Sequence, residues 1–375
     1  MKEVDLAVVG AGIVGLAHAY TAARNGLRVA VFERNSRAIG ASVRNFGLIW
    51  PIGQPAGELH RLAMRSRDIW LQILEGAALP YRSTGSLHLA YHADEAAVLQ
   101  EFAALAPETE QQCTLLSREE VVRRSPAARP EGLLCGLWSP TELTVDPRRI
   151  LAELPQVLSS EGVRFVFGAA VTHVDPPFIE AGGATWRAKK VLLCGGDDLS
   201  TLYPELLRDS GIVRCKLQMM RTCTQPGGWL LGPALAAGLT LRFYPSFRVC
   251  SSLPKLIERV ATEMPAYDRW GIHVLVSQAA DGSIALGDSH EYGDQPDLFD
   301  KPLIDDLVLD YLSSFARLPD LRIAQRWNGI YTKHPQLPWY SEAPHRDVRI
   351  VTAMGGAGMT LSFGIAERTL RNLGV

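Results

Sequence analysis

The most regular pattern of apolar and polar positions lies at the start of the chain, between Asp5 and Glu33. An apolar run at residues 6–9 is followed by a glycine turn, and an alanine-rich stretch with helical spacing continues to about residue 25. A second apolar run covers residues 28–32 and ends at the acidic Glu33. This order of strand, turn, helix and strand predicts one βαβ unit.

The residue types of this unit favour a dinucleotide. Gly10 permits a sharp turn, Gly12 lets the backbone approach a pyrophosphate, and Gly15 lets the helix pack closely on its strand. The start of the helix offers unpaired N–H groups to phosphate oxygens. Glu33 is placed to accept hydrogen bonds from ribose hydroxyls, and its charge would repel a 2′-phosphate. We therefore expect a dinucleotide with a free adenosine ribose.

The remaining chain shows two further kinds of pattern. Helical spacing predicts helices at residues 58–75, 94–105, 147–161, 302–316 and 359–372, and a capping box starts a short one at Ser117. Apolar runs predict strands at residues 85–91, 133–138, 163–171, 190–196 and 348–352, with a hairpin at 179–186. Alternating residues between 213 and 323 predict antiparallel strands at 215–222, 239–244, 272–277 and 283–287.

These patterns predict a fold class that combines α/β with α+β. A Rossmann-type dinucleotide-binding domain would be left and re-entered by the chain, because the apolar run at residues 190–196 again ends in glycines. We assign residues 1–80, 141–212 and 326–375 to this domain, and residues 81–140 and 213–325 to an antiparallel-sheet substrate domain. Residues 37–50 read as a surface loop or as a loop around the ligand, and their place after the βαβ unit favours the second.

The composition of the chain limits which kinds of binding partner are expected. Lys and Arg number 38 and Asp and Glu 40, a net charge of −2 that gives no global electrostatic reason to expect nucleic acid or an anionic membrane. The first strand begins too early for a signal peptide, and the longest uncharged run, residues 225–241, is broken by prolines and glycines. We expect a cytoplasmic protein without a membrane span. The six cysteines show no metal-binding spacing, so no metal is expected.

Four stretches together resemble the D-amino-acid-oxidase-like flavoproteins, the group that holds glycine oxidase and monomeric sarcosine oxidase. They are residues 5–33, 40–47, 190–196 and 327–367. The resemblance implies a glutathione-reductase-like domain that binds FAD, held non-covalently because no cysteine lies near residues 327–332 in the sequence. The implied cofactor-binding residues are Gly10, Gly12, Ile13, Val14, Gly15, Glu33, Arg34, Ser42, Arg44, Asn45, Gly47, Val171, Gly195, Gly356, Gly358, Met359 and Thr360.

Residues 40–54 look like a bacterial clade within this group that is associated with aminophosphonate breakdown. The resemblance implies a substrate such as N-methyl-2-aminoethylphosphonate. Glycine-oxidase-like relatives carry an arginine for the substrate carboxylate at the position of Tyr331, and a neutral phenol is a poor substitute for a guanidinium. An amine with a phosphonate group is therefore expected in place of an α-amino acid.

The implied reaction transfers a hydride from the carbon beside a neutral amine to flavin N5. Water then hydrolyses the resulting imine to an aldehyde or keto compound, and dioxygen reoxidises the flavin and forms hydrogen peroxide. The flavin supplies the chemistry, so the sequence needs no catalytic triad. Candidate residues near the substrate are Tyr331, His290, Lys333, Lys216, Gln218 and Arg44.

Three alternatives stay open. The chain could be an oxidase or dehydrogenase of glycine, sarcosine or D-amino acids. It could be a non-catalytic flavin-binding subunit of an amine dehydrogenase complex, which would keep every FAD motif. A nicotinamide dehydrogenase would share the glycine turn, but the glycine-rich return at residues 327–367 has no role in that fold.

Overall fold

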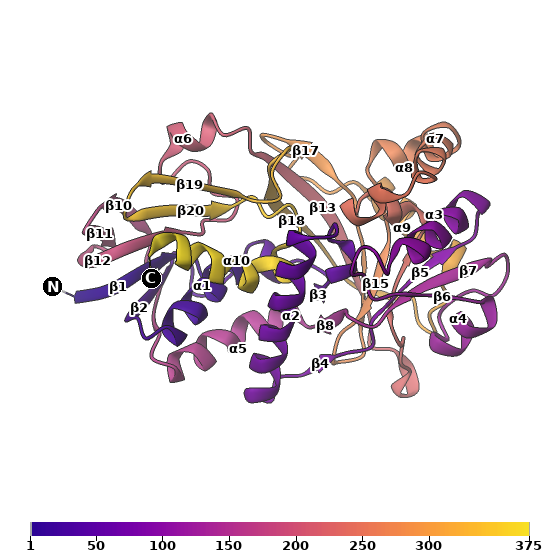
Figure 1. Cartoon of the computed structure of the whole chain (residues 1–375), viewed down its shortest axis with the longest axis horizontal. Coiled ribbons are helices and arrows are strands. Elements are labelled where there is room, and N and C mark those ends of the chain that lie inside the picture. Colours follow the sequence, from indigo (N-terminus) through magenta and orange to yellow (C-terminus); the bar gives the residue numbers. More distant parts are fainter. Residues whose placement is uncertain (1, 375) are drawn as a thin grey trace.

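The structure, a computed structural model, describes residues 2–374 and holds two large β-sheets at opposite ends of an elongated molecule (Figure 1). The eight-stranded sheet lies near both termini, and the nine-stranded sheet lies at the other end. A three-stranded sheet of order β3-β8-β4 lies between them. This mixed α/β arrangement confirms the predicted fold class.

The strands have the following bounds: β1 Lys2–Val9, β2 Val29–Glu33, β3 Leu48–Ile49, β4 Tyr81–Arg82, β5 Ser86–Ala90, β6 Thr114–Leu116, β7 Cys135–Ser139, β8 Leu143–Val145, β9 Arg164–Phe167, β10 Val171–Asp175, β11 Phe178–Ala181, β12 Ala184–Leu193, β13 Val213–Thr222, β14 Ala234–Ala237, β15 Leu275–Gln278, β16 Ile284–Gly287, β17 Glu291–Gly293, β18 Ile323–Lys333, β19 Tyr340–His345 and β20 Val348–Thr352. The α-helices are α1 Ile13–Arg24, α2 Glu58–Gly76, α3 Ala93–Leu105, α4 Arg118–Arg124, α5 Pro147–Ser160, α6 Pro204–Arg208, α7 Leu253–Glu263, α8 Pro265–Arg269, α9 Pro302–Phe315 and α10 Gly358–Leu373. Short 3-10 helices are η1 Ala41–Val43, η2 Pro51–Gly53, η3 Pro226–Gly228, η4 Gly238–Arg242 and η5 Pro245–Val249.

The predicted βαβ unit is present at the centre of the eight-stranded sheet. Strand β1 pairs in parallel with β2 and β12, and β12 pairs in parallel with β20. On β1, Leu6 and Val8 belong to one apolar cluster, whereas Ala7 belongs to another. Both faces of this strand are therefore buried, which explains its uninterrupted apolar sequence.

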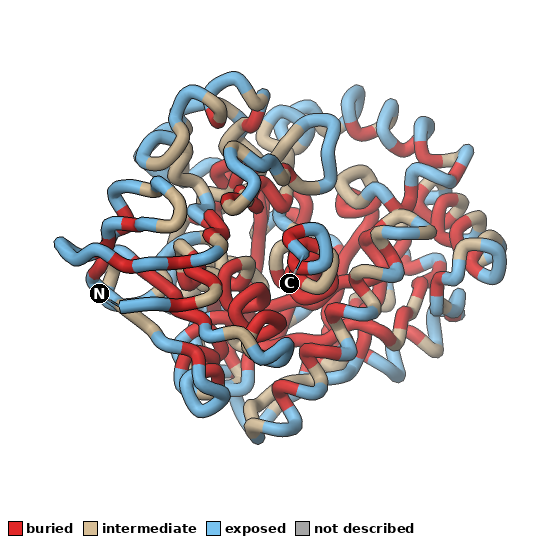
Figure 2. The backbone as a smooth tube through the Cα atoms, turned by 60° about the vertical axis from the view of Figure 1, so that its left-hand side comes forward, coloured by how far each residue is buried: buried red, intermediate tan, exposed pale blue. Residues whose placement is uncertain are grey.

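The helices that cover one face of this sheet are tied together by aromatic side chains. The ring of Phe363 on α10 packs against Trp70 on α2 at a centroid distance of 5.1 Å and against Tyr20 on α1 at 5.7 Å. The indole of Trp70 donates a hydrogen bond of 2.8 Å to the carbonyl of Met359. Figure 2 shows that buried residues, in red, are concentrated in the interior of the molecule. These contacts fix the start of α10 beside the sheet.

The nine-stranded sheet has the order β17-β13-β16-β15-β14-β5-β7-β6, and β18 pairs with β13. Its pairings are antiparallel apart from β14 with β5, so the predicted antiparallel sheet is confirmed. Strand β18 runs along β13 for ten paired positions and reaches the other sheet region through a bridge between Lys333 and Met354. The residue boundaries of the two domains stay a prediction.

Several predicted elements were wrong in detail. The expected strand at residues 163–171 is two strands, β9 and β10, because Gly168 turns the chain with φ +68°. In place of the strand expected at residues 239–244, residues 238–242 form the 3-10 helix η4, in which Leu239 and Leu241 are buried. Strand β14 and helices α7 and α8 were not predicted. Within residues 2–374, the helices are too short or too polar to cross a membrane.

Candidate active site

One cavity of about 980 Å³ extends from the glycine turn after β1 to residues of the nine-stranded sheet. Its walls include Val9, Glu33, Leu193 and Thr352, which lie at the carboxyl ends of four strands of the eight-stranded sheet. Open α/β sheets bind ligands at this edge. The predicted residues that line the cavity are Gly10, Gly12, Ile13, Val14, Glu33, Arg34, Ser42, Arg44, Asn45, Val171, Gly195, Gly356, Gly358, Met359, Thr360, Tyr331, Lys333 and His290.

The glycine turn is closely packed on the protein side and open on the cavity side. A Cβ on Gly10 would lie 2.4 Å from the carbonyl of Cys194, and a Cβ on Gly15 would lie 1.9 Å from the carbonyl of Gly10. A Cβ on Gly12 would meet only the side chain of Ser42, with its hydroxyl at 3.0 Å. Gly15 does not line the cavity. Its lack of a side chain lets α1 pack closely against the turn. The backbone at Gly12 is the surface offered to a ligand.

The side chain of Glu33, at the end of β2, is hydrogen-bonded to the glycine turn. Its Oε2 accepts a hydrogen bond of 3.0 Å from the backbone N–H of Ala11, and its Oε1 accepts one of 3.0 Å from the backbone N–H of Asn35. Arg34 pairs with Asp198 beside it. Because the carboxylate is fixed at the cavity wall, it presents a set acceptor to a ribose.

The segment after β2 wraps the cavity and is held by its own side chains. The amide of Asn45 donates to the carbonyls of Ala41 and Ser42, and its oxygen accepts from the N–H of Gly47 at 2.8 Å. Gly47 has φ +72° and does not line the cavity; a Cβ there would lie 1.8 Å from the carbonyl of Val145. The ligand-wrapping interpretation of this loop thus agrees with the structure, although Gly47 serves the loop and not the cavity surface.

Tyr331, Lys333 and His290 lie at the end of the cavity formed by the nine-stranded sheet. Burial raises the pKa of Tyr331 well above its ordinary value, so its phenol stays protonated and neutral. The ammonium of Lys333 lies 5.4 Å from the ring centroid of Tyr292. Within residues 2–374 the lysines that form ion pairs are Lys189, Lys190, Lys216 and Lys301, so Lys333 has no such partner. Cys215 pairs with Tyr331 across the two strands but is fully buried. Non-covalent attachment of the cofactor stays a prediction.

Lys216 and Gln218 do not lie in the cavity, so their expected contact with substrate is withdrawn. Side chains alternate between the two faces of β13, and Leu217 and Met219 take the cavity side. The ammonium of Lys216 donates to the carbonyl of Phe299 at 2.5 Å and lies 3.0 Å from Asp300. Gln218 similarly bonds the backbone of Lys301. Both residues hold the segment before α9.

Arg44 lines the cavity, but its guanidinium is bound to backbone. Nε donates to the carbonyl of Ile39 at 2.8 Å, and Nη1 donates to the carbonyl of Asn328 at 3.1 Å. Arg214, which also lines the cavity, donates in the same way to the carbonyls of Asp197 and Asp294. Each guanidinium is therefore oriented by backbone carbonyls that take up part of its donors.

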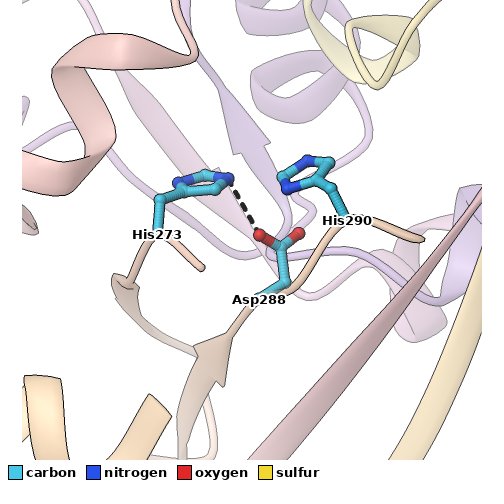
Figure 3. Close-up of side chains that lie close together, drawn as sticks. All are labelled: His273, Asp288 and His290. Atoms are coloured by element: carbon cyan, nitrogen blue, oxygen red, sulfur yellow. Dashed lines mark ion pairs between the residues drawn. The ribbon is translucent and has the colours of Figure 1, made fainter. Parts of the chain in front are cut away.

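Two polar residues of the substrate end were missed. His273 and Asp288 line the cavity beside His290, and Nε2 of His273 lies 2.8 Å from Oδ1 of Asp288 (Figure 3). One ring nitrogen of each histidine and one carboxylate oxygen of Asp288 lie within 4.8 Å of one another. The sequence held a signal for them, because Asp288 and His290 directly follow a predicted strand and His273 lies in another.

A known protein family matches nearly the whole chain. The model of the family described as "FAD dependent oxidoreductase", abbreviated DAO, matches residues 5–371. The chain belongs to this family. The predicted membership and the predicted cofactor are thereby confirmed, and the chain is an FAD-dependent oxidoreductase.

Similar proteins cover most of the chain at low identity. A subunit of opine oxidase from Rhizobium meliloti is 22% identical over 360 residues, covering 92% of this chain and 86% of the relative. The opine oxidase subunit of the same name from Agrobacterium tumefaciens (strain Ach5) is 23% identical over 350 residues, covering 89% and 83%. The aminophosphonate clade is not confirmed by these relatives.

Solved structures show the same fold. Glycine oxidase from Geobacillus kaustophilus superposes with a TM-score of 0.78 at 17% identity, covering 100% of this chain and 95% of that one. L-proline dehydrogenase from P. horikoshii gives a TM-score of 0.77 at 18% identity, covering 98% and 92%. At this identity the likeness concerns the fold alone.

The residues present fit FAD. The open backbone at Gly12, the start of α1 and the fixed carboxylate of Glu33 suit the pyrophosphate and ribose. The start of α10, with Gly356 and Gly358, forms a second polar edge of the same cavity. The individual contacts of these residues with the cofactor stay predictions.

Proposed function

We propose that the protein oxidises a small amine that carries an anionic group, with N-methyl-2-aminoethylphosphonate as the favoured substrate. Bound FAD would accept a hydride from the carbon beside the amine. The protein's own residues bind the substrate's charged ends, direct its C–H bond and keep water out. Hydrolysis of the resulting imine gives an aldehyde, and dioxygen is the favoured final electron acceptor.

One observation carries this proposal. Tyr331, which is neutral, and Lys333, which has no ion-pair partner within residues 2–374, both lie at the substrate end of the FAD cavity. An α-carboxylate is bound best by a guanidinium fork. Of the arginines that line the cavity, Arg44 and Arg214 donate to backbone carbonyls and Arg34 pairs with Asp198, whereas Arg248 is exposed. A phosphonate has three acceptor oxygens and up to two charges, so it suits separate donors such as an ammonium and a phenol.

Aromatic side chains support the exclusion of water. Phe243, Tyr244 and Tyr292 line the same end of the cavity as Tyr331. Burial raises the pKa of Tyr244 above the ordinary value for tyrosine, so its ring stays uncharged, whereas Tyr292 is 51% exposed and does not close the cavity by itself. A hydride donor enclosed by such walls is shielded from solvent.

A second candidate is a subunit of a larger amine oxidoreductase. Two curated relatives that cover most of the chain are named as a subunit of opine oxidase. In that case the chain would bind FAD by itself but would oxidise amines only with a partner chain. Flavin reduction by an amine in the isolated protein separates the two candidates.

The substrate is tested by a panel of amines added to the purified holoenzyme. N-methyl-2-aminoethylphosphonate and 2-aminoethylphosphonate are compared with glycine, sarcosine and D-alanine, and kcat/KM is measured from peroxide or from a dye acceptor. We expect the highest kcat/KM for an aminophosphonate. A higher kcat/KM for glycine or sarcosine than for both aminophosphonates would show that the phosphonate assignment is wrong.

A further inference from the structure

We propose that Asp288 binds the amino group of the substrate in its protonated form, that His290 accepts a second hydrogen bond from this group, and that His273 holds the Asp288 carboxylate in place. This describes the complex formed on binding, and the ammonium gives up one proton before hydride transfer, which proceeds from the neutral amine. This inference deepens the proposed function and rests on it for the class of ligand. It assigns an amine subsite at Asp288, which lines the same cavity as the cationic Lys333.

The backbone brings His273 and Asp288 side by side. The N–H of Asp288 donates to the carbonyl of His273 at 2.7 Å, and the N–H of His273 donates back at 3.2 Å. This pair lies beyond the ends of β15 and β16 and is shifted by one residue from their register, in which Leu275 pairs with Gly287. Paired positions place both side chains on one face, where Nε2 of His273 approaches Oδ1 of Asp288 at 2.8 Å (Figure 3). The imidazole of His273 therefore lies directly beside the carboxylate.

Asp288 is buried, and its carboxylate has no lysine or arginine as an ion-pair partner within residues 2–374. Its exposed fraction is 4%. Burial of a carboxylate is costly unless a charge or hydrogen bonds compensate. Nε2 of His273 lies 2.8 Å from Oδ1 of Asp288, but within residues 2–374 this oxygen has no partner in hydrogen-bond geometry, and an ammonium in the cavity would supply both the bond and the charge.

The tautomer of His290 is set by its backbone contact. Nδ1 lies 2.9 Å from the carbonyl of Gly271, and a carbonyl only accepts, so Nδ1 carries the hydrogen. The other nitrogen, Nε2, is then an acceptor in the neutral ring. Burial lowers the pKa of His290 to about 4, which keeps the ring neutral at physiological pH. A neutral acceptor suits an N–H donor and adds no positive charge that would repel an amine.

His290 is also fixed by aromatic neighbours. Its ring stacks on Phe243 at a centroid distance of 4.9 Å and on His273 at 5.0 Å, and it meets Tyr331 edge-on at 6.5 Å. The subsite thus lies next to the position that distinguishes this chain from the arginine-bearing relatives. A substrate whose cationic end binds Asp288 and whose anionic end binds Lys333 would carry opposite charges at its two ends, as an aminophosphonate or an amino acid does.

The test compares ligands that differ only in the amino group. Dissociation constants of the holoenzyme are measured for 2-aminoethylphosphonate against ethylphosphonate, and for glycine against acetate, by perturbation of flavin absorbance or by competition. Asp288→Asn should weaken the amine-bearing ligand of the preferred pair by about tenfold or more, the loss expected for a charged hydrogen bond, and leave its amine-free partner nearly unchanged. Asp288→Glu should retain part of the preference for the amine.

His273 is tested as a positioning residue by two variants. His273→Gln can still donate to Asp288 and should keep most of the amine preference, whereas His273→Leu should lose it. Asp281→Asn removes the same charge from an exposed position, 54% accessible, near the opposite end of β16 and serves as the matched control. Flavin content and circular dichroism identify variants that fail to fold, in which case the conservative variants decide.

Three results would overturn the inference. The first is an Asp288→Asn protein that binds amine-bearing and amine-free ligands with the wild-type ratio. The second is a wild-type protein that shows no preference for the amine in either pair. The third is a divalent metal ion, found at one per chain, whose removal abolishes amine binding. Since the comparison needs no turnover, a protein that prefers amines without oxidising them would refute the proposed function alone.

Discussion

Oε2 of Glu33 accepts a hydrogen bond of 3.0 Å from the backbone N–H of Ala11, which joins the end of β2 to the glycine turn after β1. The carboxylate is buried and lines the FAD cavity, so it supports the turn and faces the ligand at once. A substitution here should therefore affect cofactor binding in two ways, through the ribose and through the turn.

Glu33→Ala should weaken FAD binding by roughly 1.5–3 kcal/mol, the range for a charged hydrogen bond, which corresponds to about 10- to 150-fold in Kd. Glu33→Gln keeps an acceptor for Ala11 and should lose less. Titration of the apoprotein with FAD, followed by quenching of flavin fluorescence, measures both. Equal affinity in all three proteins would mean that Glu33 does not contact the cofactor.

Gly12→Ala and Gly15→Ala should fail for different reasons. A Cβ at Gly12 meets only the movable Ser42 side chain, at 3.0 Å from its hydroxyl, but enters the pyrophosphate space, so this variant should fold and lose FAD. A Cβ at Gly15 would lie 1.9 Å from a backbone carbonyl, so this variant should be strongly destabilised. Circular dichroism and flavin content of the purified proteins distinguish the two, and a fully flavinated Gly12→Ala protein would refute the assigned turn.

Lys333→Ala should raise KM for the preferred amine more than it lowers kcat, because the lost contact with the substrate anion is made equally in the ground and transition states. Lys216→Ala is the matched control, since Lys216 lies outside the cavity and pairs with Asp300. The control should leave KM unchanged within about twofold and lower the melting temperature instead. A rise of KM in the control, with none in Lys333→Ala, would reverse the two assignments.

His88 should make the protein less stable in acid. Burial lowers its pKa from the ordinary 6.5 to about 3, and within residues 2–374 neither ring nitrogen has a hydrogen-bond partner. The unfolded chain binds this proton below about pH 6.5 and the folded protein only near pH 3, so stability is present above pH 6.5 and is lost as the pH falls through that window.

Urea unfolding at pH 7.5 and pH 5 measures this effect. At pH 5 the wild type should lose about 2 kcal/mol more than His88→Leu, which keeps apolar contact with Trp50 and Phe247. His173→Gln, at an exposed position, should lose as much as the wild type. The same loss in all three proteins would show that His88 is not the cause.

The sequence predicted those parts of the site whose signals lie within a short stretch of the chain. The glycine turn, Glu33 and the start of α10 were found because strand, turn and helix signals agree within a short stretch. The face of β13 could not be read in the same way, because alternation separates Lys216 from Leu217 without saying which face meets the cavity. Which buried side chains face each other, such as His273 and Asp288, depends on strand register, which only the fold supplies.

The central claim, that this chain is a flavin-dependent amine oxidoreductase, is tested most directly by anaerobic mixing of the purified holoenzyme with N-methyl-2-aminoethylphosphonate. We predict that the absorbance of oxidised flavin disappears, and that it returns with formation of peroxide when oxygen is admitted. The claim would be contradicted by a flavin that stays oxidised with this amine and with every other amine of the panel, or by a colourless protein that binds NADH instead.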